Sequence, residues 1–182
     1  MSGIIGKYCA RLGAGAVLLA LLAPVAIAGP AEDNADAEKE FARGNLVVAI
    51  ALWKKAAALG YAPSQVWLGE ILDKSEDDEE AVAWYRKAVA QGDAAGEFGL
   101  GLMYAKGEGV KKDFVQALAL VRRSAEKNHL PAIASLRDIY KFGRFGVAID
   151  LAESEIWDAK AKELSPKPSP AKDKAAAKQE RK

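Results

Sequence analysis

Two glycines one residue apart, Gly107 and Gly109, are the best candidate for a chemical site in this sequence of 182 residues. They lie in the stretch YAKGEGVKKDFVQAL, which begins at Tyr104 and carries Lys111 and Lys112 just before an apolar run. A glycine-rich loop at the start of a helix can bind phosphate through its backbone amides. Phosphate loops, however, follow a strand, and they place either Gly-Lys-Ser/Thr after the glycines or a third glycine that opens a helix. This stretch has neither feature, so we interpret it as a turn between two helices.

A run of acidic residues, DKSEDDEE from Asp73 to Glu80, is the candidate for a metal site. A calcium loop needs a central glycine and regularly alternating oxygen ligands, and this run has neither. Acidic residues in the first turn of a helix are stabilised by the positive end of the helix dipole. We therefore predict that the run begins a helix and binds no metal, while its charge can attract a basic partner.

The sequence offers no set of side chains for nucleophilic catalysis. It contains one histidine, His129, and one cysteine, Cys9. It also has no serine in the strand-turn-helix context of a hydrolase nucleophile. We predict no catalytic residue, no metal and no cofactor.

The elements that position these residues must be helices, because apolar residues recur three and four positions apart without two-residue alternation. One pattern repeats: AIALWKKAAALGY from Ala49, AVAWYRKAVAQGD from Ala81, ALALVRRSAEKNH from Ala117 and SEIWDAKAKEL from Ser154. These starting points are 32, 36 and 37 residues apart. Periods of this length indicate stacked two-helix units, so the predicted fold class is all-α.

The glycine turn has a degenerate second copy that begins at Gly143. In each copy, a glycine just past a helix end can adopt the left-handed conformation that terminates the helix. A valine follows, which we expect to pack between the two helices, and an aspartate three residues later, Asp113 or Asp150, is a favoured N-cap. Gly69 and Gly101, which follow leucines in the preceding helices, are expected to let helix backbones approach closely.

The four tryptophans could suggest a ligand cage, but three of them lie at or beside the same place in the repeat. Packing between neighbouring units explains those three better, since large aromatic side chains stabilise a core. Trp67 has no counterpart in the other units, and we expect it to be the most exposed of the four. The tryptophans expected in the core are Trp53, Trp84 and Trp157.

The segment LGLMYAKGEGVKKDFVQALALVRRSAEKN, residues 100–128, resembles the Sel-one-like repeat, a two-helix unit related to the tetratricopeptide repeat. The preceding unit keeps the leucine-glycine pair but is four residues shorter, and the last unit replaces that pair by Leu136-Arg137. The resemblance covers about 32–164 and implies a right-handed αα-solenoid of about four repeats. The implied units are approximately 32–61, 62–93, 94–129 and 130–164.

The resemblance also implies a class of function. Members of the family mostly serve as non-enzymatic adaptors that hold other proteins, so the expected partner is another protein or a peptide rather than nucleic acid. Some disulfide-bridged members have been linked to penicillin binding and hydrolysis. They rely on a paired cysteine in each repeat, which this chain lacks. A hydrolase directed at the cell wall or at β-lactams is the alternative function.

Solenoids of this type usually bind along a concave surface lined by the first helix of each unit. The face of those helices that is turned away from the second helices mixes apolar and charged side chains, which suits a bound peptide or helix. The residues expected on this face are Val66, Glu70, Asp73, Lys74, Phe98, Leu102, Lys106, Asp138, Lys141 and Phe142.

Residues 1–28 have the features of a secretory signal peptide. Lys7 and Arg11 precede an apolar stretch that ends in a small-residue site at Ala28, after which we predict cleavage. The mature protein is then periplasmic or secreted, and it contains no cysteine because Cys9 is removed. The alternative is an uncleaved membrane anchor, since the uncharged stretch 12–31 is nearly long enough to span a bilayer.

Residues 165–182 combine proline, lysine and alanine without a large apolar residue, which predicts a disordered basic tail. The whole chain carries +1, with +2 in residues 1–28 and +4 in the tail, so the predicted solenoid domain, 29–164, carries −5. The nearly balanced total charge excludes a global attraction to nucleic acid. Membrane contact is expected only through the signal peptide or the tail, and a tail that tethers the protein to an anionic envelope surface is a further alternative function.

Overall fold

The computed structural model describes residues 29–165. Turns divide this part of the chain into eight α-helices and one 3-10 turn, and it contains no strand. The helices are α1 (Pro30–Ala42), α2 (Leu46–Ala58), α3 (Ala62–Lys74), α4 (Asp78–Ala90), α5 (Ala94–Lys106), α6 (Phe114–Glu126), α7 (Leu130–Phe142) and α8 (Leu151–Leu164), and the 3-10 turn η1 (Arg144–Gly146) precedes α8.

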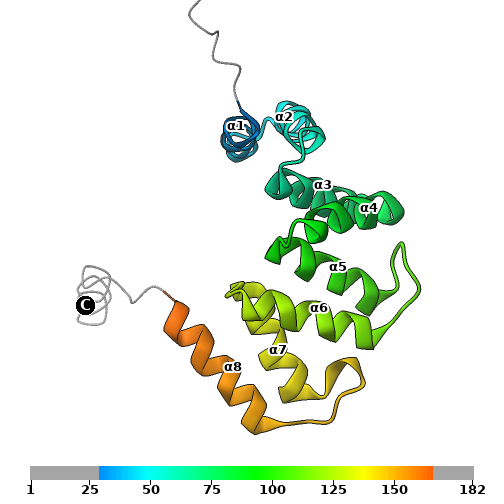
Figure 1. Ribbon diagram of the computed structural model, residues 1–182, viewed down its shortest axis with the longest axis vertical. Helices are drawn as coiled ribbons and strands as arrows, with labels where there is room; N and C mark the ends of the chain where they lie inside the picture. Colours follow the sequence, from blue (N-terminus) through cyan, green and yellow to red (C-terminus); the bar gives the residue numbers. More distant parts are fainter. Residues whose placement is uncertain (1–28, 166–182) are drawn as a thin grey trace, which may run out of the picture.

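Consecutive helices form pairs, which we number as units 1 to 4. Within a unit, α1 packs on α2, α3 on α4, α5 on α6 and α7 on α8, and the second helix of each unit packs on the first helix of the next. Figure 1 shows these helices stacked in chain order, from α1 at the top to α8 at the bottom. The all-α solenoid of two-helix repeats is therefore confirmed.

The hydrophobic core is divided along the stack into three clusters. Trp53 lies fully buried in the cluster between units 1 and 2. Tyr85 and Met103 lie in the cluster between units 2 and 3, and Ile133 and Trp157 lie in the cluster that units 3 and 4 share. Because each cluster joins neighbours only, stability is built up unit by unit along the stack.

Glycines in the first helices make room for large neighbours. A Cβ atom added at Gly69 of α3 would lie 2.7 Å from a ring carbon of Tyr85, and one added at Gly99 of α5 would lie 2.4 Å from it. A Cβ atom at Gly101 would lie 3.0 Å from a methyl group of Val121. The close approach predicted at Gly69 and Gly101 is confirmed, although at Gly69 the neighbour is a tyrosine ring rather than a helix backbone.

The stretch with two glycines is a turn between helices, as predicted. Gly107 ends α5 in the left-handed conformation with φ of 83°, and the Asp113 carboxylate caps α6 by accepting two backbone amides at 2.9 and 3.0 Å. In the second copy, Gly143 ends α7 with φ of 65° and the Asp150 carboxylate caps α8. The valines of both copies pack against core clusters. The glycine, the valine and the aspartate of each copy therefore have structural tasks.

Only the second part of the acidic run is the helix start that the sequence predicts, because Asp73 and Lys74 end α3. Asp78, Glu79 and Glu80 form the first turn of α4, where their charges are stabilised by the helix dipole.

Two sequence predictions concern residues outside the described range, namely the signal peptide 1–28 with its cleavage after Ala28, and the tail beyond Ser165. Among the helices between residues 29 and 165, none is both long and apolar enough to cross a membrane.

Candidate partner-binding surface

Equivalent residues of the four first helices form a row along the stack. The ninth residues of α1, α3, α5 and α7 are Glu38, Glu70, Leu102 and Asp138, and each is at least partly exposed. We call the surface around this row the first-helix face. Three carboxylates and one leucine make it an acidic face with an apolar centre.

Tyr85 extends from α4 toward this face, into the space that Gly69 and Gly99 leave free. Burial raises the pKa of the Tyr85 hydroxyl, and the nearby charges of Glu70 and Asp73 act in the same direction. The sequence prediction missed Tyr85, although two helical glycines in neighbouring units leave space for a large side chain to pack between them.

Glu70 is a half-buried carboxylate in the middle of the row. Burial raises the pKa of Glu70 above its ordinary value, and the charge of Asp73 adds to this effect, while Lys74 opposes it. An ionised carboxylate that is partly removed from water is stabilised by any hydrogen-bond donor or cation that a partner brings to it. Glu70 is therefore suited to binding.

The structure corrects the prediction for Val66. Its side chain is 7% exposed and belongs to the core cluster around Tyr85 and Met103. Each step along a helix rotates the side-chain direction by about 100°, so Val66 and Glu70 do not point the same way. Val66 is turned toward the next unit, where it packs in the core.

Phe98 lies at the equivalent place in α5 and is partly buried. It packs against the core cluster of units 3 and 4, and its ring centroid lies 5.5 Å from that of His129. Burial lowers the pKa of His129, which precedes α7 and serves packing there. Only part of the Phe98 side chain is available to a partner.

Asp73 and Lys106 are brought together across units 2 and 3. The Lys106 ammonium lies 3.3 Å from the Asp73 carboxylate and 2.8 Å from the Glu108 carboxylate. The carboxylate oxygens of Asp73, Asp78 and Glu108 lie within 4.8 Å of one another. Because an ammonium group already lies among these carboxylates, the cluster is an ion-pair network that joins α3 to the turn after α5.

The remaining predicted residues lie toward the loops or the end of the stack. Lys74 is exposed at the end of α3, and Phe142 is 54% exposed at the end of α7. Lys141 lines a shallow depression between α7 and α8, together with Asp138 and Glu155. Of the ten predicted residues, Glu70, Leu102 and Asp138 are the ones that share the row.

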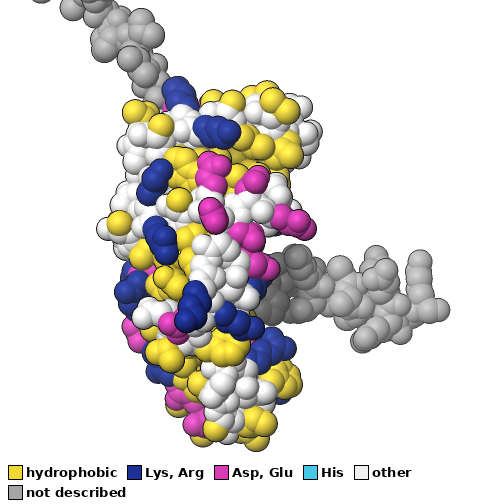
Figure 2. All heavy atoms as spheres, turned by 90° about the vertical axis from the view of Figure 1, so that its right-hand side faces the viewer, with side chains coloured by type: hydrophobic (Ala, Val, Ile, Leu, Met, Phe, Trp, Pro, Cys, Tyr) yellow, Lys and Arg dark blue, Asp and Glu magenta, His cyan; other side chains and the backbone are white. Residues whose placement is uncertain are grey.

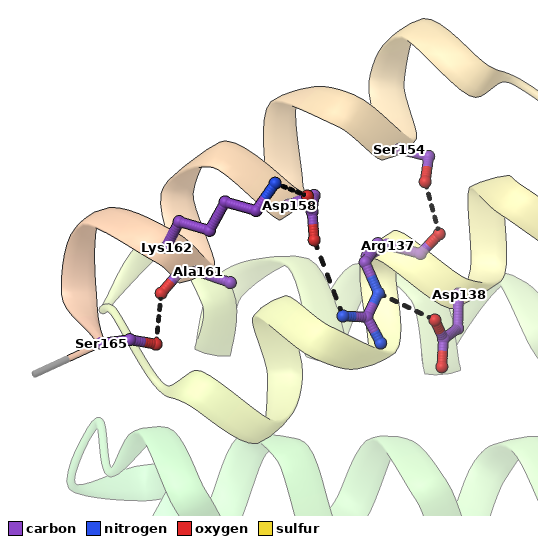
Figure 3. Close-up of polar contacts among 7 residues, drawn as sticks. All are labelled: Arg137, Asp138, Ser154, Asp158, Ala161, Lys162 and Ser165. Carbon is purple, nitrogen blue, oxygen red and sulfur yellow. Dashed lines mark hydrogen bonds and ion pairs between the residues drawn. The ribbon is translucent and has the colours of Figure 1, made fainter. Parts of the chain in front are cut away.

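A charged network covers the end of the stack at unit 4 (Figure 3). Arg137 on α7 lies 3.0 Å from Asp138 and 3.7 Å from Asp158, and Lys162 lies 2.6 Å from Asp158. The places of Arg137, Asp158 and Lys162 in unit 3 hold buried residues: two belong to the core cluster that α7 joins, and the third, a glycine, packs closely against α6. Those counterparts are Gly101, Val121 and Ala125.

This network was not predicted, although Arg137 in place of the repeat glycine was a signal for it. A charged surface on a terminal unit keeps a solenoid from stacking further.

Trp67 is more exposed than Trp53 and Trp157 and falls in the same partly buried class as Trp84. It is partly buried and stacks on Trp53 with ring centroids 4.7 Å apart. Its indole Nε1 donates to the Glu38 carboxylate at 3.4 Å, and Phe41 lies 5.5 Å away. The prediction of a core position is confirmed for Trp53 and Trp157, while Trp84 is only partly buried. Trp67 thus belongs to the first-helix face as an aromatic neighbour of the row.

Comparisons with known proteins match this architecture. The profile described as Sel1 repeat matches residues 41–61, 62–93 and 94–129. The chain is 33% identical over 94 residues to DAP3-binding cell death enhancer 1 of Rattus norvegicus, a match that covers 50% of this chain and 18% of that protein. It is 38% identical over 63 residues to the uncharacterized protein NMB1327 of Neisseria meningitidis serogroup B, covering 35% of this chain and 14% of the relative. The chain thus spans less than a fifth of the length of these relatives.

Solved structures share the fold. A protective antigen of uropathogenic Escherichia coli that displays an SLR fold has a TM-score of 0.64 and 30% identity over 76% of this chain and 31% of its own. A Sel1 repeat protein of Oxalobacter formigenes has a TM-score of 0.61 and 29% identity over 73% of this chain and 40% of its own. Sel1 repeat proteins generally mediate protein–protein interaction, and their fold is typical of non-enzymatic scaffolds. The chain belongs to the Sel1 repeat family.

Proposed function

We propose that this chain is a periplasmic or secreted scaffold that binds a protein or peptide partner along the first-helix face, in the groove of the solenoid. The observation that carries the proposal is the row of Glu70, Leu102 and Asp138, which are partly exposed on three successive first helices. An extended peptide or a helix needs such a row of spaced contacts on a rigid surface.

The chemistry of the face defines the partner further. Half-buried carboxylates at Glu70 and Asp138 flank Leu102. The Tyr85 ring lies close to Glu70, and Trp67 donates to Glu38 of the same row. Such a face selects a segment with basic or hydrogen-bond donor groups on either side of an apolar side chain. The name DAP3-binding cell death enhancer 1, carried by a relative that matches half of this chain, also favours a protein as the partner.

Cross-linking in the native envelope tests the groove. We expect the double variant with Glu70→Gln and Leu102→Ala to lower the yield of cross-linked partner about tenfold, equivalent to ~1.4 kcal/mol of binding free energy. Phe98 is left unchanged because it also packs in the core.

The matched control is the double variant with Val47→Ala and Val115→Ala, whose side chains are 83% and 78% exposed on second helices. It should capture the partner as well as the wild type does. If both double variants, or neither, lose the partner while their thermal unfolding is unchanged, the groove assignment is wrong.

The proposed periplasmic or secreted location of the protein is tested separately. We expect the protein purified from the cell envelope to begin at Gly29, as determined by N-terminal sequencing, and to be released with the periplasmic fraction. Intact residues 1–28 in a membrane fraction would instead support the anchor.

A further inference from the structure

The loops that join the two helices of units 2, 3 and 4 lie on one side of the molecule, on the right in Figure 1. Figure 2 shows that side: acidic side chains gather above its centre, and Lys and Arg side chains lie below them among hydrophobic ones. The two halves of this edge therefore differ in charge.

Exposed phenylalanines form the apolar part of the lower half. The rings of Phe114 on α6 and Phe145 in η1 are stacked, with centroids 5.5 Å apart and planes 10° apart. Phe114 is 38% exposed and Phe142 is 54% exposed. Phe145 has a left-handed backbone with φ of 58° and ψ of 27°. This conformation is rare for a bulky residue, and such residues concentrate at functional sites.

Cations surround these rings. The Lys112 ammonium lies 4.9 Å from the Phe114 ring centroid, and the Arg144 guanidinium lies 5.3 Å from that of Phe142. Arg86, Lys111 and Lys112 line one shallow depression together with Phe114. Within residues 29–165, none of these four cations forms an ion pair.

One carboxylate, that of Asp113, lines the same depression. It is already engaged as the N-cap of α6. The side chains that line the depression therefore carry a net positive charge, although the solenoid domain as a whole carries −5.

We propose that this loop-edge patch binds an acidic peptide segment of a partner protein that carries an aromatic or apolar side chain between its carboxylates. The patch consists of Arg86, Lys111, Lys112, Phe114, Phe142 and Arg144. Unpaired cations attract carboxylates, and the exposed rings bury apolar side chains, so the combination selects a segment with both features. The site is separate from the first-helix face and adds a second binding surface of opposite charge.

The distribution of charge favours a peptide over an extended polyanion or an anionic membrane. The acidic start of α4, with Asp78, Glu79 and Glu80, lies beside the patch, because a Cβ atom added at Gly109 of the depression would lie 2.3 Å from the Asp78 carbonyl oxygen. A long anionic polymer or a flat anionic surface would meet these carboxylates and be repelled. A short acidic segment can contact the cations of the patch without reaching these carboxylates.

Fluorescence anisotropy with a labelled twelve-residue peptide of glutamates and two phenylalanines tests the proposal on the full chain. We expect binding that weakens as the salt concentration rises from about 50 to about 300 mM. The double variant with Lys112→Ala and Arg144→Ala should bind the peptide about tenfold more weakly. The variant with Phe142→Ala should also lose affinity at unchanged charge.

The matched control is the double variant with Lys54→Ala and Lys87→Ala, which removes the same charge from second helices of units 1 and 2 and should bind as the wild type does. Equal losses in the two double variants would overturn the proposal, as would a peptide without phenylalanine that binds equally well. Binding of phosphatidylglycerol vesicles or inorganic phosphate in place of the peptide, lost in the Lys112 and Arg144 variant, would also overturn it. Equal thermal unfolding of all variants shows that each is folded.

Discussion

Glu70 illustrates how a single residue can be poorly placed for stability and well placed for binding. Burial raises the pKa of this carboxyl, so folded Glu70 takes up a proton more readily than unfolded Glu70 does. The ionised form therefore lowers the stability of the native state above the raised pKa, and this loss disappears as the pH falls through it.

We predict that Glu70→Gln leaves the free energy of unfolding at pH 7.5 unchanged or raises it by up to about 0.5 kcal/mol. The difference from the wild type should shrink as the pH falls below the raised pKa and vanish below the ordinary pKa of glutamate, where Glu70 is protonated in both states. Thermal unfolding followed by circular dichroism at both pH values measures this. A clear loss of stability at pH 7.5 would mean that Glu70 is held by stabilising contacts rather than left open for a partner.

Gly99 offers a second test at the scale of one residue. Alanine in place of a helical glycine normally stabilises a helix by about 1 kcal/mol. At this position, however, the added methyl group would lie 2.4 Å from the Tyr85 ring. We predict that Gly99→Ala destabilises the protein by about 1 to 3 kcal/mol, as overpacking does. Urea unfolding measures the change, and a gain in stability would show that the ring moves aside freely.

At the scale of the helices, the glycine turn makes the start of α6 depend on Asp113. Its carboxylate accepts the amides of Val115 and Gln116, whereas Asp77, at the same place before α4, makes no such bond. The two aspartates therefore form a natural comparison between a working cap and an unused one.

We predict that Asp113→Ala lowers the free energy of unfolding by about 1 kcal/mol. Asp77→Ala should change it by less than about 0.5 kcal/mol, as an exposed substitution without lost contacts does. Urea unfolding of both variants gives the comparison. Similar changes in the two variants would mean that the cap contributes little and that local charge decides the effect.

Sequence periodicity was sufficient to predict the helices, their pairing and the caps at Asp113 and Asp150, because these depend on neighbours within one repeat. It was insufficient for Val66, whose burial depends on how far the next unit rotates in the stack. It was also insufficient for the loop-edge patch, because Phe114 and Phe145 meet only after α6 and the turn beyond α7 have packed. Contacts between units, rather than within them, were the part that the sequence left open.

At the scale of the whole molecule, unit 4 differs from unit 3 in carrying a charged network where the described stack ends. Asp158 and Lys162 occupy the places of Val121 and Ala125, which in unit 3 pack in the cluster with α7, and Arg137 occupies that of Gly101. Replacing them by their unit 3 counterparts would create an apolar surface at the end of the solenoid, and such surfaces drive association.

We predict that the triple variant with Arg137→Gly, Asp158→Val and Lys162→Ala associates with itself more strongly than the wild type. Sedimentation velocity should show a faster species whose share grows with protein concentration. Identical sedimentation of the two proteins across the concentration series, with helix content preserved, would show that other features keep the stack from growing.

Trp67 stacks on Trp53 where units 1 and 2 meet, and both indoles are intrinsic fluorescent probes of unfolding. Indole fluorescence will sense units 1 and 2, through Trp53, Trp67 and Trp84, and unit 4, through Trp157, while unit 3 contains no tryptophan. Circular dichroism senses all helices equally. If the ends of the stack fray before its middle, the fluorescence transition will precede the dichroism transition, and the gap between them will measure how tightly neighbouring units are coupled.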